Sequence, residues 1–128
     1  MRQLTKDLSI AATTTVYLSL ADSGDLKWAI KNVRILSDAS IATHAANYYT
    51  AALVGSDGTS GIGSWTGNSS GGTALTAGVP AGIAVAGSLG TAGELNMSSG
   101  QSLKLVMTKT GSAADFTGQL LVELEPVA

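Results

Sequence analysis

The sequence predicts an all-β protein, a single antiparallel β-sandwich, from two alternating runs of residues and from the composition. Leu103, Leu105 and Met107 stand two residues apart, and residues 120–125 repeat this alternation, as expected of neighbouring strands with one buried face. Glycine, serine, threonine and alanine dominate the remainder, a composition typical of short strands joined by polar turns. The 128 residues suffice for one domain with a substantial core.

Residues 3–10 alternate weakly, and residues 1–12 stand apart from the predicted sandwich domain, residues 13–128. Leu4, Leu8 and Ile10 form an apolar stripe in this terminal segment. A weak strand at a terminus predicts either an edge strand or an extended N-terminal arm that becomes ordered on a partner.

Two further strands are expected within residues 13–20 and 27–37. In the first, apolar residues alternate with threonine, tyrosine and serine, and β-branched threonine favours extended backbone. In the second, the apolar residues change phase after Ile30, which predicts a β-bulge near Lys31 and Asn32. An amphipathic helix is the weaker alternative for the second segment.

The middle of the chain predicts one clear strand and a long glycine-rich loop. Residues 47–55 alternate with both faces partly apolar, as in a strand covered on both sides or lying at a subunit contact. Residues 55–82 are rich in glycine and predict an extended surface loop, or a loop that holds one short strand at 62–66. Trp65 is the expected anchor of this loop, and residues 79–89 suggest another short strand.

The seven or eight expected strands, several of them separated by long connections, predict a sandwich of jelly-roll type. The alternation also predicts the core, which contains Val16, Leu18, Ile35, Leu53, Leu103, Leu105, Met107, Leu120, Val122 and Leu124.

Charge and composition argue against several classes of partner. The net charge of −2 argues against nucleic acid, because binding phosphates requires a basic surface. No run of apolar residues is long enough for a transmembrane helix, and the N-terminal residues do not resemble a signal peptide. We therefore expect no membrane association, and a chain that stays in the cytoplasm or leaves the cell within a larger particle. The absence of cysteine excludes disulfides and thiolate sites.

No catalytic, cofactor or metal motif is recognisable, so we expect a protein that is not an enzyme. His44 is the single histidine and lies in the small-residue segment 39–46, expected to be a loop or one helical turn. No nucleophile elbow accompanies it, and one histidine without cysteine does not make a zinc site. Asp22, Asp25 and Asp57 adjoin glycine or serine as in ordinary turns.

Three segments resemble small β-sandwich virion proteins of tailed bacteriophages: Val33-Arg34-Ile35, residues 47–53, and residues 99–111 with the strand that follows. This group includes head decoration (cement) proteins and related head-fibre or tail modules, and the resemblance covers roughly residues 27–127. It implies a non-enzymatic structural role in the virion, after assembly in the host cytoplasm. It further implies a homotrimer that binds the major capsid protein or another virion protein.

The residues themselves also indicate a surface for association, because charges are few and some strand residues are apolar on the outward phase. A carbohydrate- or receptor-binding module of a phage fibre or tail is the alternative function; it would use the glycine-rich loop and the aromatic residues Tyr17, Tyr48 and Trp65. The candidate partner-binding residues are Leu4, Leu8, Ile10, Tyr17, Trp65 and Leu121.

Overall fold

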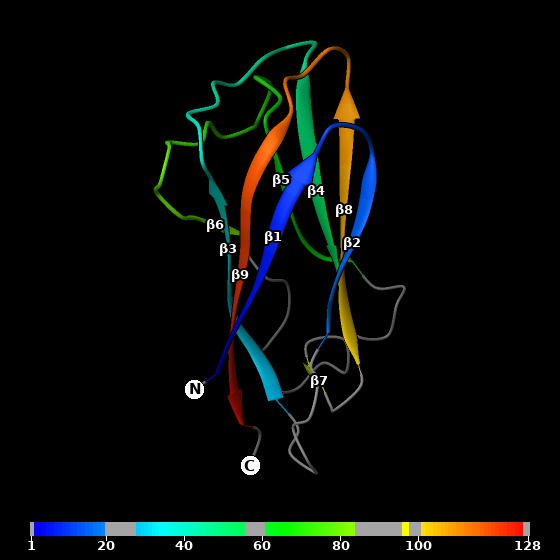
Figure 1. Cartoon of the computed structure of the whole chain (residues 1–128), viewed down its shortest axis with the longest axis vertical. Coiled ribbons are helices and arrows are strands. Elements are labelled where there is room, and N and C mark those ends of the chain that lie inside the picture. Colours follow the sequence, from blue (N-terminus) through cyan, green and yellow to red (C-terminus); the bar gives the residue numbers. More distant parts are fainter. Residues whose placement is uncertain (1, 20–27, 56–60, 84–95, 98–100, 127–128) are drawn as a thin grey trace.

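The computed structural model describes residues 2–19, 28–55, 61–83, 96–97 and 101–126, and within them it contains nine strands and no helix (Figure 1). The helical alternative for residues 27–37 is therefore wrong. The turns predicted at Asp22, Asp25 and Asp57 lie outside the described residues. The strands are β1 (Arg2–Ile10), β2 (Thr14–Ser19), β3 (Trp28–Ser37), β4 (Tyr48–Val54), β5 (Gly61–Thr66), β6 (Ala81–Ile83), β7 (Asn96–Met97), β8 (Ser102–Thr110) and β9 (Phe116–Pro126).

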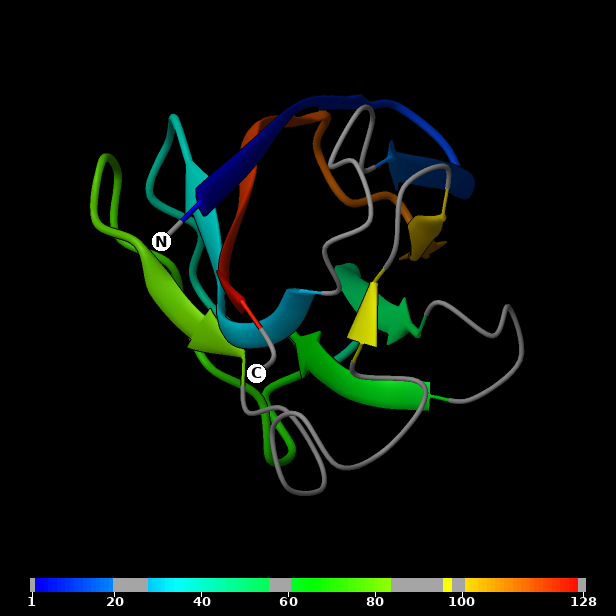
Figure 2. The same ribbon diagram turned by 90° about the horizontal axis from the view of Figure 1, so that it is seen from below.

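The strands form two antiparallel sheets that pack face to face, which confirms the predicted β-sandwich. Sheet A has the order β1-β9-β3-β6, with the short β7 beside the start of β3, and sheet B has the order β2-β8-β4-β5. Seen along the strands in Figure 2, the two sheets enclose a common interior.

The paired strands are nested in sequence order, with the innermost pair in the middle of the chain and the outermost pair at its two ends. β4 pairs with β5, β3 with β6, β2 with β8 and β1 with β9, so the first half of the chain runs antiparallel to the second half. One end of the sandwich, here called the loop end, carries the β1–β2, β3–β4, β5–β6 and β8–β9 connections. The β3–β4 and β8–β9 connections meet at the top of Figure 1.

The interior contains the residues that the alternation predicted. Nine of the ten are less than a tenth exposed, and Val16 is half-buried against them. The remaining buried hydrophobic residues are Leu8, Ile10, Ala29, Ile30, Val33, Tyr49, Ala51, Ile62, Trp65, Leu75, Ile83 and Phe116.

The predicted β-bulge is present in β3. The register with β9 is regular up to Ile30 and resumes at Asn32, so that Lys31 is the extra residue. A bulge moves the following residues to the opposite phase. Ile30 and Val33, three residues apart, are therefore both buried.

Residues 2–10 form an edge strand rather than a free arm. β1 pairs with β9 along its whole length, from Arg2–Leu124 to Ile10–Phe116. Leu8 and Ile10 are only 3% and 2% exposed, because the inward face of β1 is part of the core.

The glycine-rich segment contains β5, so the alternative with a short strand applies. Trp65 points from β5 into the sandwich and is 7% exposed, so it is not the exposed aromatic residue that a sugar-binding surface would use. The short strand expected near Ile83 is β6, and residues 84–89 lie outside the described residues.

The outer faces of the two sheets differ in charge. On sheet A, hydrogen bonds or ion pairs join the charged side chains to neighbouring side chains; the residues concerned are Asp7, Lys31, Arg34, Glu123 and Glu125. Lys31 Nζ, for example, lies 2.7 Å from Glu125 Oε1. On sheet B, the described outward residues are threonine, serine, tyrosine, valine and alanine, together with a single charged residue, Lys104. Sheet B therefore presents an outer face that is poor in charge.

Candidate functional site

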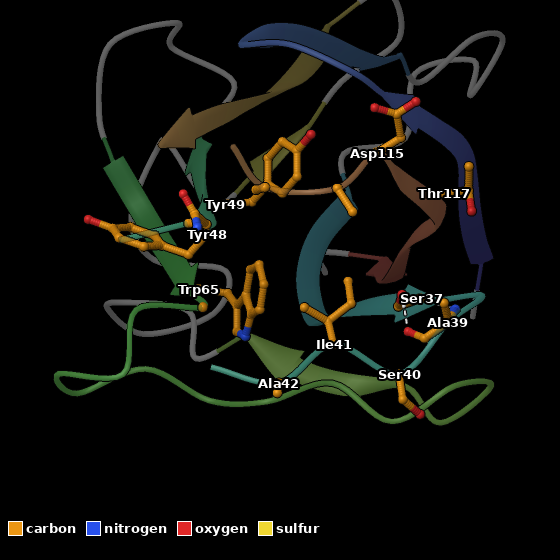
Figure 3. Close-up of a pocket in the computed structure, with 14 residues that line it drawn as sticks. Ser37, Ala39, Ser40, Ile41, Ala42, Tyr48, Tyr49, Trp65, Asp115 and Thr117 are labelled. Atoms are coloured by element: carbon orange, nitrogen blue, oxygen red, sulfur yellow. Dashed lines mark hydrogen bonds between the residues drawn. The ribbon is translucent and has the colours of Figure 1, made fainter. Parts of the chain in front are cut away.

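A pocket of about 160 Å³ lies at the loop end, between the β3–β4 connection (residues 38–47) and the β8–β9 connection (residues 111–115) (Figure 3). Ile41, Tyr49 and Trp65 surround it, whereas the ring of Tyr48 points away to the outer side of sheet B. Small side chains complete its wall, namely Ala39, Ala42, Ala113 and Ala114.

Trp65 forms one wall of the pocket and is held by two constraints. Its position on β5, opposite Ala51 of β4, directs the ring into the sandwich. Its Nε1 donates a 3.0 Å hydrogen bond to the carbonyl oxygen of Thr73, so the buried N–H has a partner. The ring is therefore a fixed apolar surface.

Tyr49 forms the inner wall and connects the pocket to β1. Its hydroxyl donates a 3.1 Å hydrogen bond to the carbonyl oxygen of Ile10, and its ring meets Phe116 edge to face at 6.1 Å. Burial raises the pKa of the Tyr49 hydroxyl, and the negative charge of Asp115 raises it further. The phenol therefore remains a neutral donor at physiological pH.

The pocket exists because its rim residues are small while its walls are fixed. Backbone hydrogen bonds of 2.8 and 2.9 Å join Ile41 to Leu75 and hold the isoleucine beside Trp65. Alanine side chains end one carbon from the backbone and leave the space between the walls unfilled. Among the described lining residues one is charged, Asp115, and it lies exposed at the rim. This arrangement suits the binding of a small apolar group.

His44 organises the β3–β4 connection. Its Nδ1 accepts hydrogen bonds from the backbone N–H groups of Ala46 (3.0 Å) and Asn47 (2.9 Å). Its own backbone binds the β5–β6 connection, donating to Gly67 and accepting from Ser69. The structure thus places His44 in an exposed loop, as predicted, and gives its ring a role as a turn acceptor.

Gly111 and Asn47 join the two connections that flank the pocket. Asn47 Oδ1 accepts a 2.8 Å hydrogen bond from the backbone N–H of Ser112. Gly111 has a φ of +67°, and a Cβ there would overlap the Ala46 carbonyl oxygen and Asn47 Oδ1. Glycine at position 111 thus permits both the left-handed turn and the close approach of the β3–β4 connection.

Three of the six candidate partner-binding residues are buried within the chain itself. Leu8, Ile10 and Trp65 are buried inside the sandwich, where the monomer itself uses them. An apolar stripe in the sequence indicates residues that are buried, but it does not indicate whether they pack against the same chain or against a partner protein.

The other three candidates lie at the surface in different places. Tyr17 is 58% exposed on the outer face of sheet B. Leu121 is half-buried on the outer face of sheet A, and Leu4 is half-buried near the start of β1. These three residues do not form one patch, since they belong to two different sheets.

The described residues contain no group of three or more histidine, cysteine, aspartate or glutamate side chains placed to hold a metal ion. Within the same part of the chain, no helix is long and apolar enough to cross a membrane.

Sequence reasoning missed the pocket because its lining comes from segments without periodicity. Ile41, Ala113 and Asp115 lie outside every strand and converge through the β3–β4 and β8–β9 connections. The available signal was the run of small residues at 39–46, which indicated a loop without indicating a cavity.

The chain matches no known family model, no curated protein and no solved structure.

Proposed function

We propose that this chain is a non-enzymatic virion structural protein, a capsid decoration (cement) protein that binds the outer face of a phage head lattice as a homotrimer. The trimer and the virion location follow from the resemblance in residues 27–127. Its contact with the shell is the outer face of sheet B.

The strand order supports a protein of this architectural class. Without the two-residue β7, eight strands remain in two sheets, ordered β1-β9-β3-β6 and β2-β8-β4-β5. This is the order of a jelly roll, an architecture that occurs in viral capsid and lectin domains. Because the same fold serves several functions, the proposal rests on the surface and not on the fold.

The observation that carries the proposal is the contrast between the outer faces. Charged side chains on sheet A are matched with neighbours within the sheet and suit solvent. The outer face of sheet B offers instead mostly uncharged side chains, with Val106 between Thr15 and Ala52, two tyrosines (Tyr17 and Tyr48) and one lysine, Lys104. The cores of protein interfaces are depleted in charge in the same way.

The size of this face favours a multivalent contact. Four strands about 4.8 Å apart, each about six residues long, give a footprint of about 400 Å². A stable interface buries about 800 Å² per partner, so one copy would bind weakly. Three linked copies bind far more tightly, because later contacts form at high effective concentration.

A cosedimentation assay tests the proposal, with tailed-phage heads stripped of the protein as the probe. Thr108→Glu places a charge on the outer face of sheet B and should reduce occupancy of the heads strongly. Thr5→Glu is the matched control, since Thr5 is an exposed threonine on the outer face of sheet A. Equal occupancy by both variants, or no binding by the wild-type chain, would reject the proposal.

The alternative, a carbohydrate- or receptor-binding module of a phage fibre or tail, is favoured by the pocket at the loop end. A sugar that stacks on Trp65 would have to enter this pocket, because the ring is otherwise buried. Specific binding of the isolated chain on a glycan array, lost on substituting Ala42 by Trp at the rim, would favour this function over decoration.

A further inference from the structure

Close to the pocket, an exposed apolar side chain projects from a tight turn. Val79 lies in residues 76–80, here called the Val79 turn, and is 54% exposed. Among the described residues it shares this degree of exposure with one other large hydrophobic residue, Tyr17. The described residues of the Val79 turn and its flanks, 68–83, contain no charged side chain.

The Val79 turn is held rigidly. The backbone N–H of Ala77 donates to Ser40 Oγ (3.0 Å), and that of Gly78 donates to the Ser37 carbonyl oxygen (2.9 Å). Gly78 has a φ of +72°, and Pro80 fixes the backbone directly after Val79. The valine is therefore presented in one orientation and loses little conformational freedom on binding.

The pocket has the size and polarity for such a side chain. A dry apolar cavity of about 150 Å³ in another protein accommodates benzene, so about 160 Å³ accepts a branched aliphatic side chain. Ile41 and Trp65 supply apolar walls, and the exposed Asp115 stays at the rim. The apolar side chain of Val79 suits these apolar walls.

We propose that Val79 of one copy enters the pocket of the next copy, so that the chains associate head to tail in a closed ring. This inference rests on the homo-oligomer of the proposed function and names the residues that form it. Such a heterologous interface joins two different surfaces of the same chain, and it closes into a ring when the rotation between neighbours permits.

Hydrogen bonds within the chain fix the position of the Val79 turn relative to the pocket of the same chain. Ser37 and Ser40 both line the pocket and both hold the Val79 turn. Ser37 is itself locked, because its buried Oγ donates to the Ala39 carbonyl oxygen at 2.6 Å. The Val79 turn and the pocket are thus fixed relative to each other, and Val79 is not among the residues that line the pocket of its own chain.

Light scattering after size exclusion, at micromolar concentration of the full chain, tests this interface. Val79→Glu should weaken association about 10- to 100-fold, the effect of losing one buried aliphatic side chain. Ala42→Trp should weaken it similarly by closing the rim of the pocket. Tyr17→Glu is the matched control, and it should leave the mass unchanged because Tyr17 lies on sheet B.

Mixing the two interface variants gives a sharper test. The Val79→Glu chain keeps an intact pocket, and the Ala42→Trp chain keeps an intact Val79. In the mixture, Val79 of the second chain can therefore enter the pocket of the first. A 1:1 complex should form from two chains that are each monomeric alone. This result does not depend on either variant being as stable as the wild type, provided that both give the β-rich circular dichroism spectrum of a folded chain.

Three outcomes would overturn the inference: a monomeric wild-type chain, loss of association in Tyr17→Glu but not in Val79→Glu, or no complex on mixing. If a monomeric wild-type chain still occupies stripped phage heads, decoration stands while this interface fails.

Discussion

At the scale of single residues, a glycine in β9 permits a close approach to the neighbouring strand β3. Gly118 of β9 lies between Leu8 of β1 and Ser37 of β3. A Cβ at this position would overlap the carbonyl oxygen of Leu36. Because the clashing atom belongs to the backbone, β9 and β3 would have to move apart to accommodate a side chain at this position.

Substitution Gly118→Ala should therefore lower the free energy of unfolding by about 3 kcal/mol, the upper range for overpacking a core. Gly82→Ala is the matched control, because a Cβ at this exposed strand position meets nothing within 4 Å. Urea unfolding followed by tryptophan fluorescence measures both. Equal midpoints for the two variants would contradict the prediction.

Tyr49 makes the stability depend on pH in the alkaline range. Burial raises the pKa of its hydroxyl above the ordinary value of 10.0, with a further contribution from Asp115. The unfolded chain thus loses this proton at lower pH than the folded chain. The corresponding stability is complete below pH 10 and decreases as the pH rises toward the pKa of the folded state.

We expect the wild-type chain to lose more unfolding free energy above pH 10 than Tyr49→Phe, which has no hydroxyl to titrate. Chemical unfolding at a series of alkaline pH values gives the dependence of the unfolding free energy on pH for each of the two chains. The ion pair between Lys31 and Glu125 is present in both chains and cancels in the comparison. Parallel slopes would show that Tyr49 is not the group responsible.

At the scale of elements, the alternation predicted which residues of each strand face inward, but it did not predict which strands pair with one another. Leu105 and Val122 were placed in the core from periodicity alone, and the change of phase near Lys31 located the bulge. β5 was less certain, because Ile62 and Trp65 are three residues apart and its register with β4 shifts between Leu53 and Val54.

The pocket was beyond reach of sequence reasoning for a different reason. Its walls depend on hydrogen bonds between connections, such as those that join Ile41 to Leu75 and His44 to Gly67. Such pairings have no periodic signature in the sequence. Likewise, the burial of Leu8 required knowing that β1 pairs with β9.

The edge strand β1 carries a charged residue, Lys6, that opposes pairing with the strands of other chains. Lys6 stands on the inward phase between Leu4 and Leu8, opposite Leu120 of β9, and is nevertheless exposed. A lysine on the inward phase of an edge strand would be buried by any chain that extended the sheet, so it opposes edge-to-edge association.

Lys6→Val should therefore increase aggregation or non-native oligomers of the isolated chain, with little loss of folded stability. Thr5→Val is the matched control, because it adds the same side chain to the outward phase of the same strand. Static light scattering over time at constant temperature follows both variants. If Thr5→Val aggregates as fast as Lys6→Val, added hydrophobicity and not the missing charge is the cause.

At the scale of the whole molecule, charge is distributed so that association should depend little on salt. The described charged strand residues lie mostly on the outer face of sheet A, whereas the outer face of sheet B has Lys104 and the Val79 turn has none. Interfaces built on sheet B and on the Val79 turn would gain stability chiefly from apolar burial. Coulombic attraction would contribute mainly to the rate of encounter.

Raising the salt from about 0.1 M to about 1 M shortens the Debye length from about 10 Å to about 3 Å and weakens exposed ion pairs strongly. Self-association and occupancy of phage heads should nevertheless change less than about threefold over this range. Analytical ultracentrifugation and cosedimentation in the same buffers measure the two. Release of the protein from heads at high salt, with self-association unchanged, would show that a charged surface such as the outer face of sheet A meets the shell. Loss of self-association alone would place the contact between copies on charged residues instead of Val79.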